Sequence, residues 1–241
     1  MRKNSLLYFT VFAAGMTTLA VELSASRLLG YVFGTSNLVW ASIIGLILVY
    51  LTLGYFLGGR LADRHPDAGL FYRLLAWGAL SSGVIPFLSR PVLRTAANAF
   101  DRLAVGVLAG SFSAVLVLFI LPVTLLGMIS PFAIRLAMED ASRAGTVAGR
   151  VYAISTLGSF VGTFIPVLWL IPLIGVTLTF LVFGAFLSLV ALWGLWRYRG
   201  GKTALRWAWI PLLLGLLALL WGRGTIKNTP GQIFERESAY N

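Results

Sequence analysis

Long apolar runs, separated by short polar or charged stretches, dominate the pattern of the chain. Most runs have about 20 residues, and at about 1.5 Å per helical residue they can cross a hydrocarbon core of about 30 Å. The runs are expected over residues 6–29, 38–57, 70–88, 105–138, 151–171, 176–196 and 207–221. The pattern therefore predicts an all-α fold, a polytopic transmembrane helix bundle of six to seven spans.

Three segments depart from a simple spanning pattern. Residues 105–138 are too long for one straight crossing, and Pro122 and Pro131 are expected to break or kink that helix. Residues 90–103 carry apolar side chains at helical spacing opposite polar ones, which predicts an amphipathic helix on the membrane surface. The run 207–221 is short, so we expect either a seventh span or a helix that only dips into the membrane.

Two pairs of glycines suggest close packing between helices. Gly54 and Gly58 stand four residues apart in one run, and Gly158 and Gly162 do so in another. Residues at this spacing share one helix face, where the absence of a side chain lets a neighbouring backbone approach. We therefore expect both pairs to lie at helix contacts inside the bundle.

Composition and charge agree with a membrane protein. The 241 residues are 59% hydrophobic and 11% charged, whereas soluble domains carry about 25% charged residues. The net charge of +11 lies in short loops rather than on one continuous face, so no nucleic-acid partner is expected. The positive-inside rule predicts an inner-membrane, multi-pass protein with a cytoplasmic N-terminus. Most of the 19 Lys and Arg would then be cytoplasmic: Arg2, Lys3, Arg60, Arg64, Arg73, Arg135, Arg143, Arg150, Arg197, Arg199, Lys202 and Arg206.

The sequence contains few of the side chains that usually take part in catalysis. The chain has no Cys and one His, so neither a metal site nor a catalytic triad is expected. It has eight Asp and Glu and no glycine-rich phosphate-binding loop. We therefore expect no catalytic residue and no cofactor within this sequence.

Several stretches in the right order resemble one family of membrane proteins. The turn between the second and third runs, GGRLADRHPD, resembles the Gly-x-x-x-Asp-Arg loop of major facilitator transporters. Helices of the fused major-facilitator/spermidine synthase family are similar to AVELSASRLLGYVFG, LPVTLLGMISPFAIRL and GRVYAISTLGSFVGTFIPVLWLIPLIG. The final ERESAYN is similar to the start of that family's aminopropyltransferase-like domain, and Ser155 stands where the family usually has Asn.

The resemblance implies a division into domains and a set of functions. Residues 1–222 would form the transmembrane domain, and residues 223–241 a linker and the first residues of an aminopropyltransferase-like domain. The membrane part, resembling half of a major facilitator, would anchor that catalytic domain and supply or sense polyamine. Alternatives are a half-sized transporter acting as a homodimer, and a structural subunit of a larger membrane complex. Partners would be the lipid bilayer, a C-terminal catalytic domain or subunit, and polyamine.

Candidate polar or substrate-binding residues lie in the predicted helices. An intramembrane carboxylate is costly, so Glu22 is either a proton- or polyamine-binding group or part of an ion pair with Arg27, Arg94 or Arg102. Three further candidates for binding are Trp40, Tyr152 and Ser155. Trp40 and Tyr152 would belong to an aromatic cage for an ammonium group, together with Tyr50 and Trp169.

A second group of candidates forms a possible conformational latch. Arg60, Asp63 and Arg64 lie in the turn between the second and third runs, and Arg135 ends the fourth. Ion pairs that form and break there could bias two states of the bundle. The alternative is a charged turn that fixes only topology and the angle between two helices.

Overall fold

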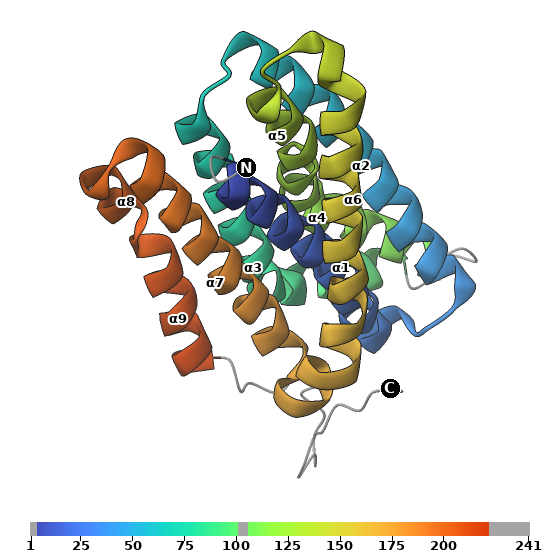
Figure 1. The fold of residues 1–241 in the computed structure, drawn as a ribbon. Helices are drawn as coiled ribbons and strands as arrows, with labels where there is room; N and C mark the ends of the chain where they lie inside the picture. Colours follow the sequence, from blue (N-terminus) through green and yellow to red (C-terminus); the bar gives the residue numbers. More distant parts are fainter. Residues whose placement is uncertain (1–3, 101–105, 222–241) are drawn as a thin grey trace.

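The computed structural model describes residues 4–100 and 106–221, which form a bundle of helices without strands (Figure 1). The fold class predicted from the apolar runs is confirmed. The elements in chain order are α1 (Ser5–Phe33), α2 (Asn37–Arg64), α3 (Ala68–Phe100), α4 (Gly106–Gly127), α5 (Ile129–Ala137), the short 3-10 helix η2 (Ala141–Arg143), α6 (Ala144–Ile165), the π-helical segment η3 (Pro166–Leu170), α7 (Ile171–Arg199), α8 (Gly201–Trp207) and α9 (Trp209–Trp221).

The described chain passes through the bundle seven times. Six helical stretches are long and apolar enough to cross a membrane. The longest, Ala141–Arg199, folds back on itself, so that α6 and α7 run in opposite directions (Figure 1). At the reversal, Gly175 has a φ of +82°, which a residue with a side chain rarely adopts. The π-helical segment begins at Pro166, where proline removes a backbone donor from the helical ladder.

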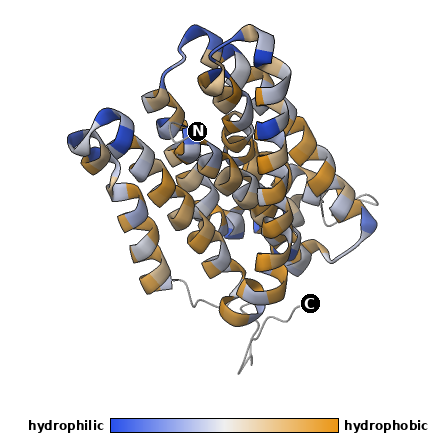
Figure 2. Cartoon of the chain, in the orientation of Figure 1, coloured by the Kyte–Doolittle hydropathy of each residue, from blue (hydrophilic) through white to orange (hydrophobic). Residues whose placement is uncertain are grey.

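We call one end of the bundle the charged end and the other the far end. The charged end carries the start of α1, the α2–α3 loop, the α5–α6 connection and the turn from α7 into α8 (Figure 1). Hydrophilic residues gather there, while the helices below are largely apolar (Figure 2). The helix sides are covered by large exposed apolar residues such as Phe160 and Leu219. This belt suits a lipid bilayer rather than water.

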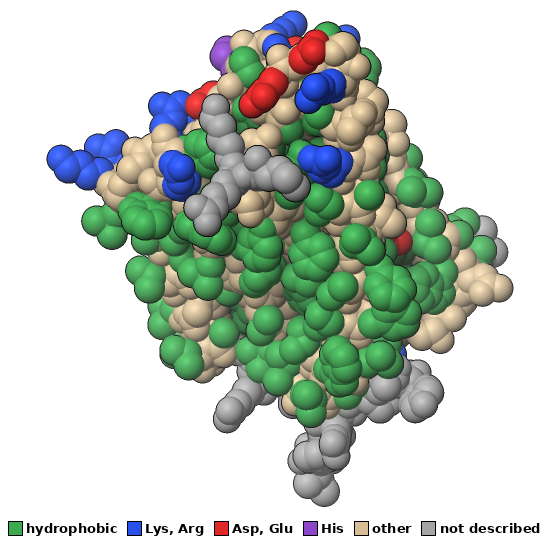
Figure 3. Space-filling view, viewed as in Figure 1, with side chains coloured by type: hydrophobic (Ala, Val, Ile, Leu, Met, Phe, Trp, Pro, Cys, Tyr) green, Lys and Arg blue, Asp and Glu red, His purple; other side chains and the backbone are tan. Residues whose placement is uncertain are grey.

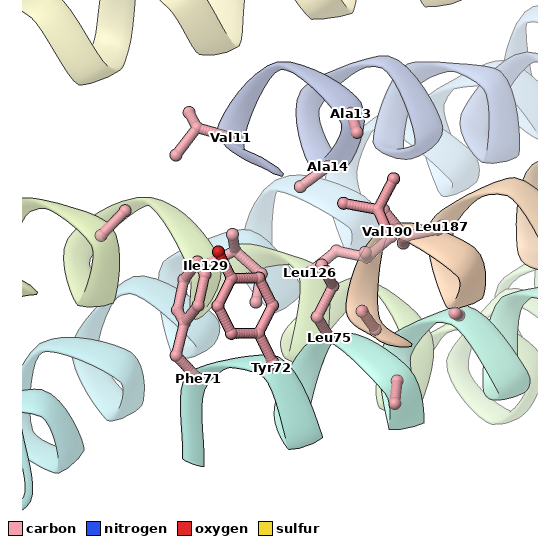
Figure 4. Close-up of a cluster of buried hydrophobic side chains, with 14 of the residues drawn as sticks. Val11, Ala13, Ala14, Phe71, Tyr72, Leu75, Leu126, Ile129, Leu187 and Val190 are labelled. Carbon is pink, nitrogen blue, oxygen red and sulfur yellow. The ribbon is translucent and has the colours of Figure 1, made fainter. Parts of the chain in front are cut away.

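Helix α1 lies inside the bundle and contacts α2 to α7. Most of its middle part is buried, from Val11 to Val21, with Ala and Gly allowing neighbours to come close. One large core cluster joins α1 to α3, α4, α5 and α7 around Phe71, Tyr72 and Leu187 (Figure 4). Gly194 on α7 leaves room for the ring of Tyr72. The fold therefore depends on close contact around one central helix.

Local signals explain where several helices begin and end. The Oγ of Ser36 accepts a hydrogen bond from the backbone N–H of Val39, which caps α2. The predicted interruption of residues 105–138 falls at Met128, between α4 and α5. Pro131 lies in the first turn of α5, where its ring cannot follow an uninterrupted helix.

One local prediction is wrong. Residues 90–103 were expected to form a separate surface helix, but α3 continues without a break from Ala68 to Phe100 and contains both Pro86 and Pro91, while residues 101–103 lie outside the described residues. Leu93 and Ala96 are buried in a second core cluster with side chains of α1, α2 and α4. The apolar stripe of this segment therefore faces the protein interior. Its burial outweighs the cost of proline within a helix.

Candidate functional site

The α2–α3 loop is tied to two distant helices at the charged end. The Arg135 Nε on α5 lies 3.2 Å from the Asp63 carboxylate at the end of α2. The Arg199 guanidinium at the end of α7 donates a hydrogen bond to the Asp67 carboxylate. Asp67 also lies 3.8 Å from a nitrogen of Arg73. These pairs join the end of α2 and the α2–α3 loop to α5 and α7.

The structure thus brings together only part of the proposed latch. Asp63 and Arg135 form an ion pair, whereas the Arg60 guanidinium lies 4.1 Å from the centre of the Phe56 ring. Arg64 is in the last turn of α2, where a positive charge complements the helix dipole. That these pairs break and form again during function stays a prediction.

Asp67 is a site residue that the sequence analysis missed. Its carboxylate accepts hydrogen bonds from the backbone N–H groups of Gly69 (3.1 Å) and Leu70 (3.0 Å), which starts α3. An Asp just before an apolar run is a capping signal, so this role was recognisable. Its partner Arg199 is 132 residues away in sequence, and no local pattern connects the two.

The surroundings of Asp67 favour its charged form. Partial desolvation alone would raise the pKa of the Asp67 carboxyl, but hydrogen bonds from Arg199, Gly69 and Leu70 outweigh it and lower that pKa. A lowered folded pKa means that the stabilisation is present above the unfolded pKa and is lost as pH falls through the folded value. The pairs are about half exposed, so their contribution is small.

Replacing Asp67 with Asn should therefore lower stability at neutral pH by about 1 kcal/mol or less. The difference in melting temperature between wild type and Asp67→Asn should shrink as pH falls below the ordinary aspartate range. Thermal unfolding of the detergent-solubilised protein across that range measures it. A gap that widens in acid would contradict the assigned pKa direction.

A polar cavity lies beside this ion-pair cluster. It has a volume of about 820 Å³ and is lined by the first turns of α1, the end of α5, η2 and the first turns of α6. Charged groups of both signs line it, namely Glu139, Asp140, Arg143 and Arg150. Tyr8 and Val147 contribute apolar walls. Its lining is more polar than that of two other cavities, one between α2 and α4 and one between α3 and α4.

Glu22 lies in the part of α1 that approaches the far end. It is half-buried, and within the described residues no ion pair joins its carboxylate to a Lys or Arg. Arg27 is one and a half turns further along α1 and is also half-buried. Arg94 on α3 is exposed, and Arg102 lies outside the described residues. The roles of Glu22 and Arg27 therefore stay predictions.

The remaining binding candidates do not converge. Trp40 is near the start of α2 at the far end, while Tyr152 is near the start of α6 at the charged end (Figure 1). Tyr152 is half exposed and lies close to Tyr55 rather than to Trp40. The structure therefore does not place Trp40 and Tyr152 in one aromatic cage.

Ser155 and the glycine pairs lie at helix contacts. A Cβ at Gly15 would lie 2.9 Å from the Ser155 Oγ, so Ser155 packs directly on α1. Gly158 and Gly162 face the backbone of α1, and Gly54 and Gly58 face α4 and Met128. In each of the four positions an added Cβ would lie closer than 3 Å to a neighbouring backbone atom. These residues lie at close helix contacts, and a ligand-binding role for Ser155 stays a prediction.

Metal binding has no support in the described part of the chain, where no group of three or more His, Cys, Asp or Glu residues could hold an ion. His65 lies exposed in the α2–α3 loop.

Comparison with known proteins finds two relatives of the chain. It is similar to polyamine aminopropyltransferase 2 and polyamine aminopropyltransferase 1 of Ralstonia nicotianae, with 30% identity to each over 203 residues. The matched part is 82% of this chain but 36% and 35% of the two relatives. The chain thus spans about a third of the length of these curated relatives. No protein-family model matches it, and no solved structure does.

Proposed function

We propose that the chain is the membrane-embedded domain of a spermidine synthase-like protein. The similarity to two polyamine aminopropyltransferases over 82% of the chain carries this proposal. Seven passes of apolar helix supply a membrane anchor for an aminopropyltransferase-like domain or subunit. We also propose that the bundle resembles half of a major facilitator and is fused to the aminopropyltransferase-like domain.

The bundle also supplies or senses polyamine. A polyamine carries several ammonium groups, and a carboxylate held among helices in a medium of low dielectric attracts such a group strongly. Glu22 has this character, because it is half-buried and has no ion-pair partner in the described part of the chain. It is therefore the residue we assign to the ammonium group.

Removing the charge of Glu22 tests this assignment. A charge-assisted hydrogen bond is worth about 1.5–3 kcal/mol, so Glu22→Gln should weaken spermidine binding about tenfold or more. Binding of labelled spermidine to the purified protein in lipid nanodiscs provides the measurement. Glu22→Asp is the matched variant, since it keeps the carboxylate and should retain most of the affinity.

Two results would count against the polyamine role. Equal binding by a folded Glu22→Gln variant would remove Glu22 from the site. Absence of saturable spermidine binding by the wild-type protein would leave the bundle only its anchoring role. Competition by putrescine would extend the assignment to a diamine.

A further inference from the structure

The polar cavity at the charged end is lined by opposite charges that form no direct ion pair with each other. Glu139, Asp140, Arg143 and Arg150 all line it. None of the ion pairs found among the described residues joins either carboxylate of the cavity to either arginine. Charges that face a cavity without pairing leave their hydrogen-bonding capacity to a bound molecule.

Two of these groups are held in place by their neighbours. The Asp140 carboxylate accepts hydrogen bonds from the backbone N–H of Ser142 (2.9 Å) and from its hydroxyl. The Arg150 guanidinium lies 5.8 Å from the centre of the Tyr8 ring, within reach of a cation–π contact. Each group keeps free positions, because a carboxylate has about four acceptor sites and a guanidinium has five donors.

Because both acidic and basic side chains line the cavity, a ligand that carries both a cation and an anion fits it best. A polyamine bound here would meet the guanidinium groups of Arg143 and Arg150, and an anion would meet the carboxylates of Glu139 and Asp140. A molecule with both an ammonium and a phosphate satisfies both sets at once. The volume of about 820 Å³ is within the range typical of small-molecule sites.

The position of the cavity points to the membrane surface. Acidic and basic side chains gather at this end of the bundle, above a broad apolar surface (Figure 3). Two turns or less beyond Arg150 along α6, the exposed residues Tyr152 and Leu157 already belong to the apolar belt. A group bound to Arg150 therefore lies at the level where phospholipid headgroups meet the hydrocarbon core.

We infer that this cavity binds an amino-phosphate zwitterion, with Arg143 and Arg150 on the phosphate and Glu139 and Asp140 on the primary ammonium. The phosphatidylethanolamine headgroup and soluble phosphoethanolamine share this chemistry. The site is distinct from Glu22 and does not depend on the polyamine role. Phosphatidylcholine should bind less well because its quaternary ammonium donates no hydrogen bond, and phosphatidylglycerol should bind less well because it lacks the cation.

Native mass spectrometry of the purified protein with phosphatidylethanolamine, phosphatidylcholine or phosphatidylglycerol tests the inference. Phosphatidylethanolamine should be retained preferentially, and Glu139→Gln and Arg150→Gln should each weaken its binding about tenfold. Arg206→Gln is the matched control, because Arg206 lies at the same end on α8 and does not line the cavity. It should bind phosphatidylethanolamine as the wild type does.

Titration with soluble phosphoethanolamine separates the two sources of the ligand. Binding that both cavity variants weaken would show that the headgroup alone suffices, whereas binding of the lipid alone would show that acyl chains contribute. Either result supports the site if the variants act as predicted. The inference would be overturned by equal retention of the three lipids or by an absence of effect of either variant. It would also be overturned by competition from spermidine that the same variants abolish.

Discussion

Gly162→Ala should destabilise the protein by about 2–3 kcal/mol, although it adds only one methyl group. The new Cβ would overlap the carbonyl oxygen of Met16 and lie 2.8 Å from the Met16 Cα. Neither atom can move without shifting the backbone of α1. Because α1 contacts α2 to α7, the strain would reach most of the bundle.

The same substitution elsewhere on α6 is the control. Gly149 is exposed, and a Cβ built there meets no other atom within 4 Å. Alanine favours a helix over glycine by about 1 kcal/mol, so Gly149→Ala should leave stability unchanged or raise it slightly. Thermal unfolding in detergent, followed by loss of the monodisperse species, measures both variants. Equal melting temperatures would mean that α1 and α6 are not in close contact.

The apolar runs predicted the helices well because lipid leaves the backbone few alternatives. Hydrogen bonds of a spanning segment must be satisfied internally, so a long apolar run becomes a helix whatever its neighbours. The glycine pairs were recognisable for a related reason: Gly158 and Gly162 repeat at the spacing of one helix face. What sequence could not provide was the partner helix, which is α1 for this pair.

The predictions failed where a local pattern had two physical solutions. An amphipathic stripe can face lipid headgroups or a protein core, and here Val92, Leu93 and Ala96 face the core. Candidate site residues were also hard to group, since Trp40 and Tyr152 share a chemistry but lie at opposite ends. The polar cavity was missed because its charged residues, between Glu139 and Arg150, face a wall formed by the first turns of α1, which lies more than a hundred residues earlier in the sequence.

The two ends of the bundle should be accessible to a water-soluble reagent from opposite sides of the membrane. Basic residues of the described chain gather at the charged end, where they include Arg60, Arg64, Arg143, Arg197 and Lys202. From this distribution the positive-inside rule predicts that the charged end faces the cytoplasm. With seven passes, the α1–α2 loop and the end of α9 would both lie on the opposite side.

The chain suits a direct measurement of this arrangement because it has no cysteine. Single cysteines can be placed at Thr35 in the α1–α2 loop, at His65 in the α2–α3 loop and at Ala141 in η2, all of them exposed positions. Labelling by a membrane-impermeant maleimide in intact cells should modify Thr35→Cys alone. The other two variants should react only after the membrane is opened.

The most direct test of the membrane-spanning bundle is this comparison of labelling before and after permeabilisation. The account predicts protection of His65→Cys and Ala141→Cys in intact cells, with full reaction of Thr35→Cys. Labelling of all three positions from the same side would contradict a bundle whose two ends face opposite sides of the membrane.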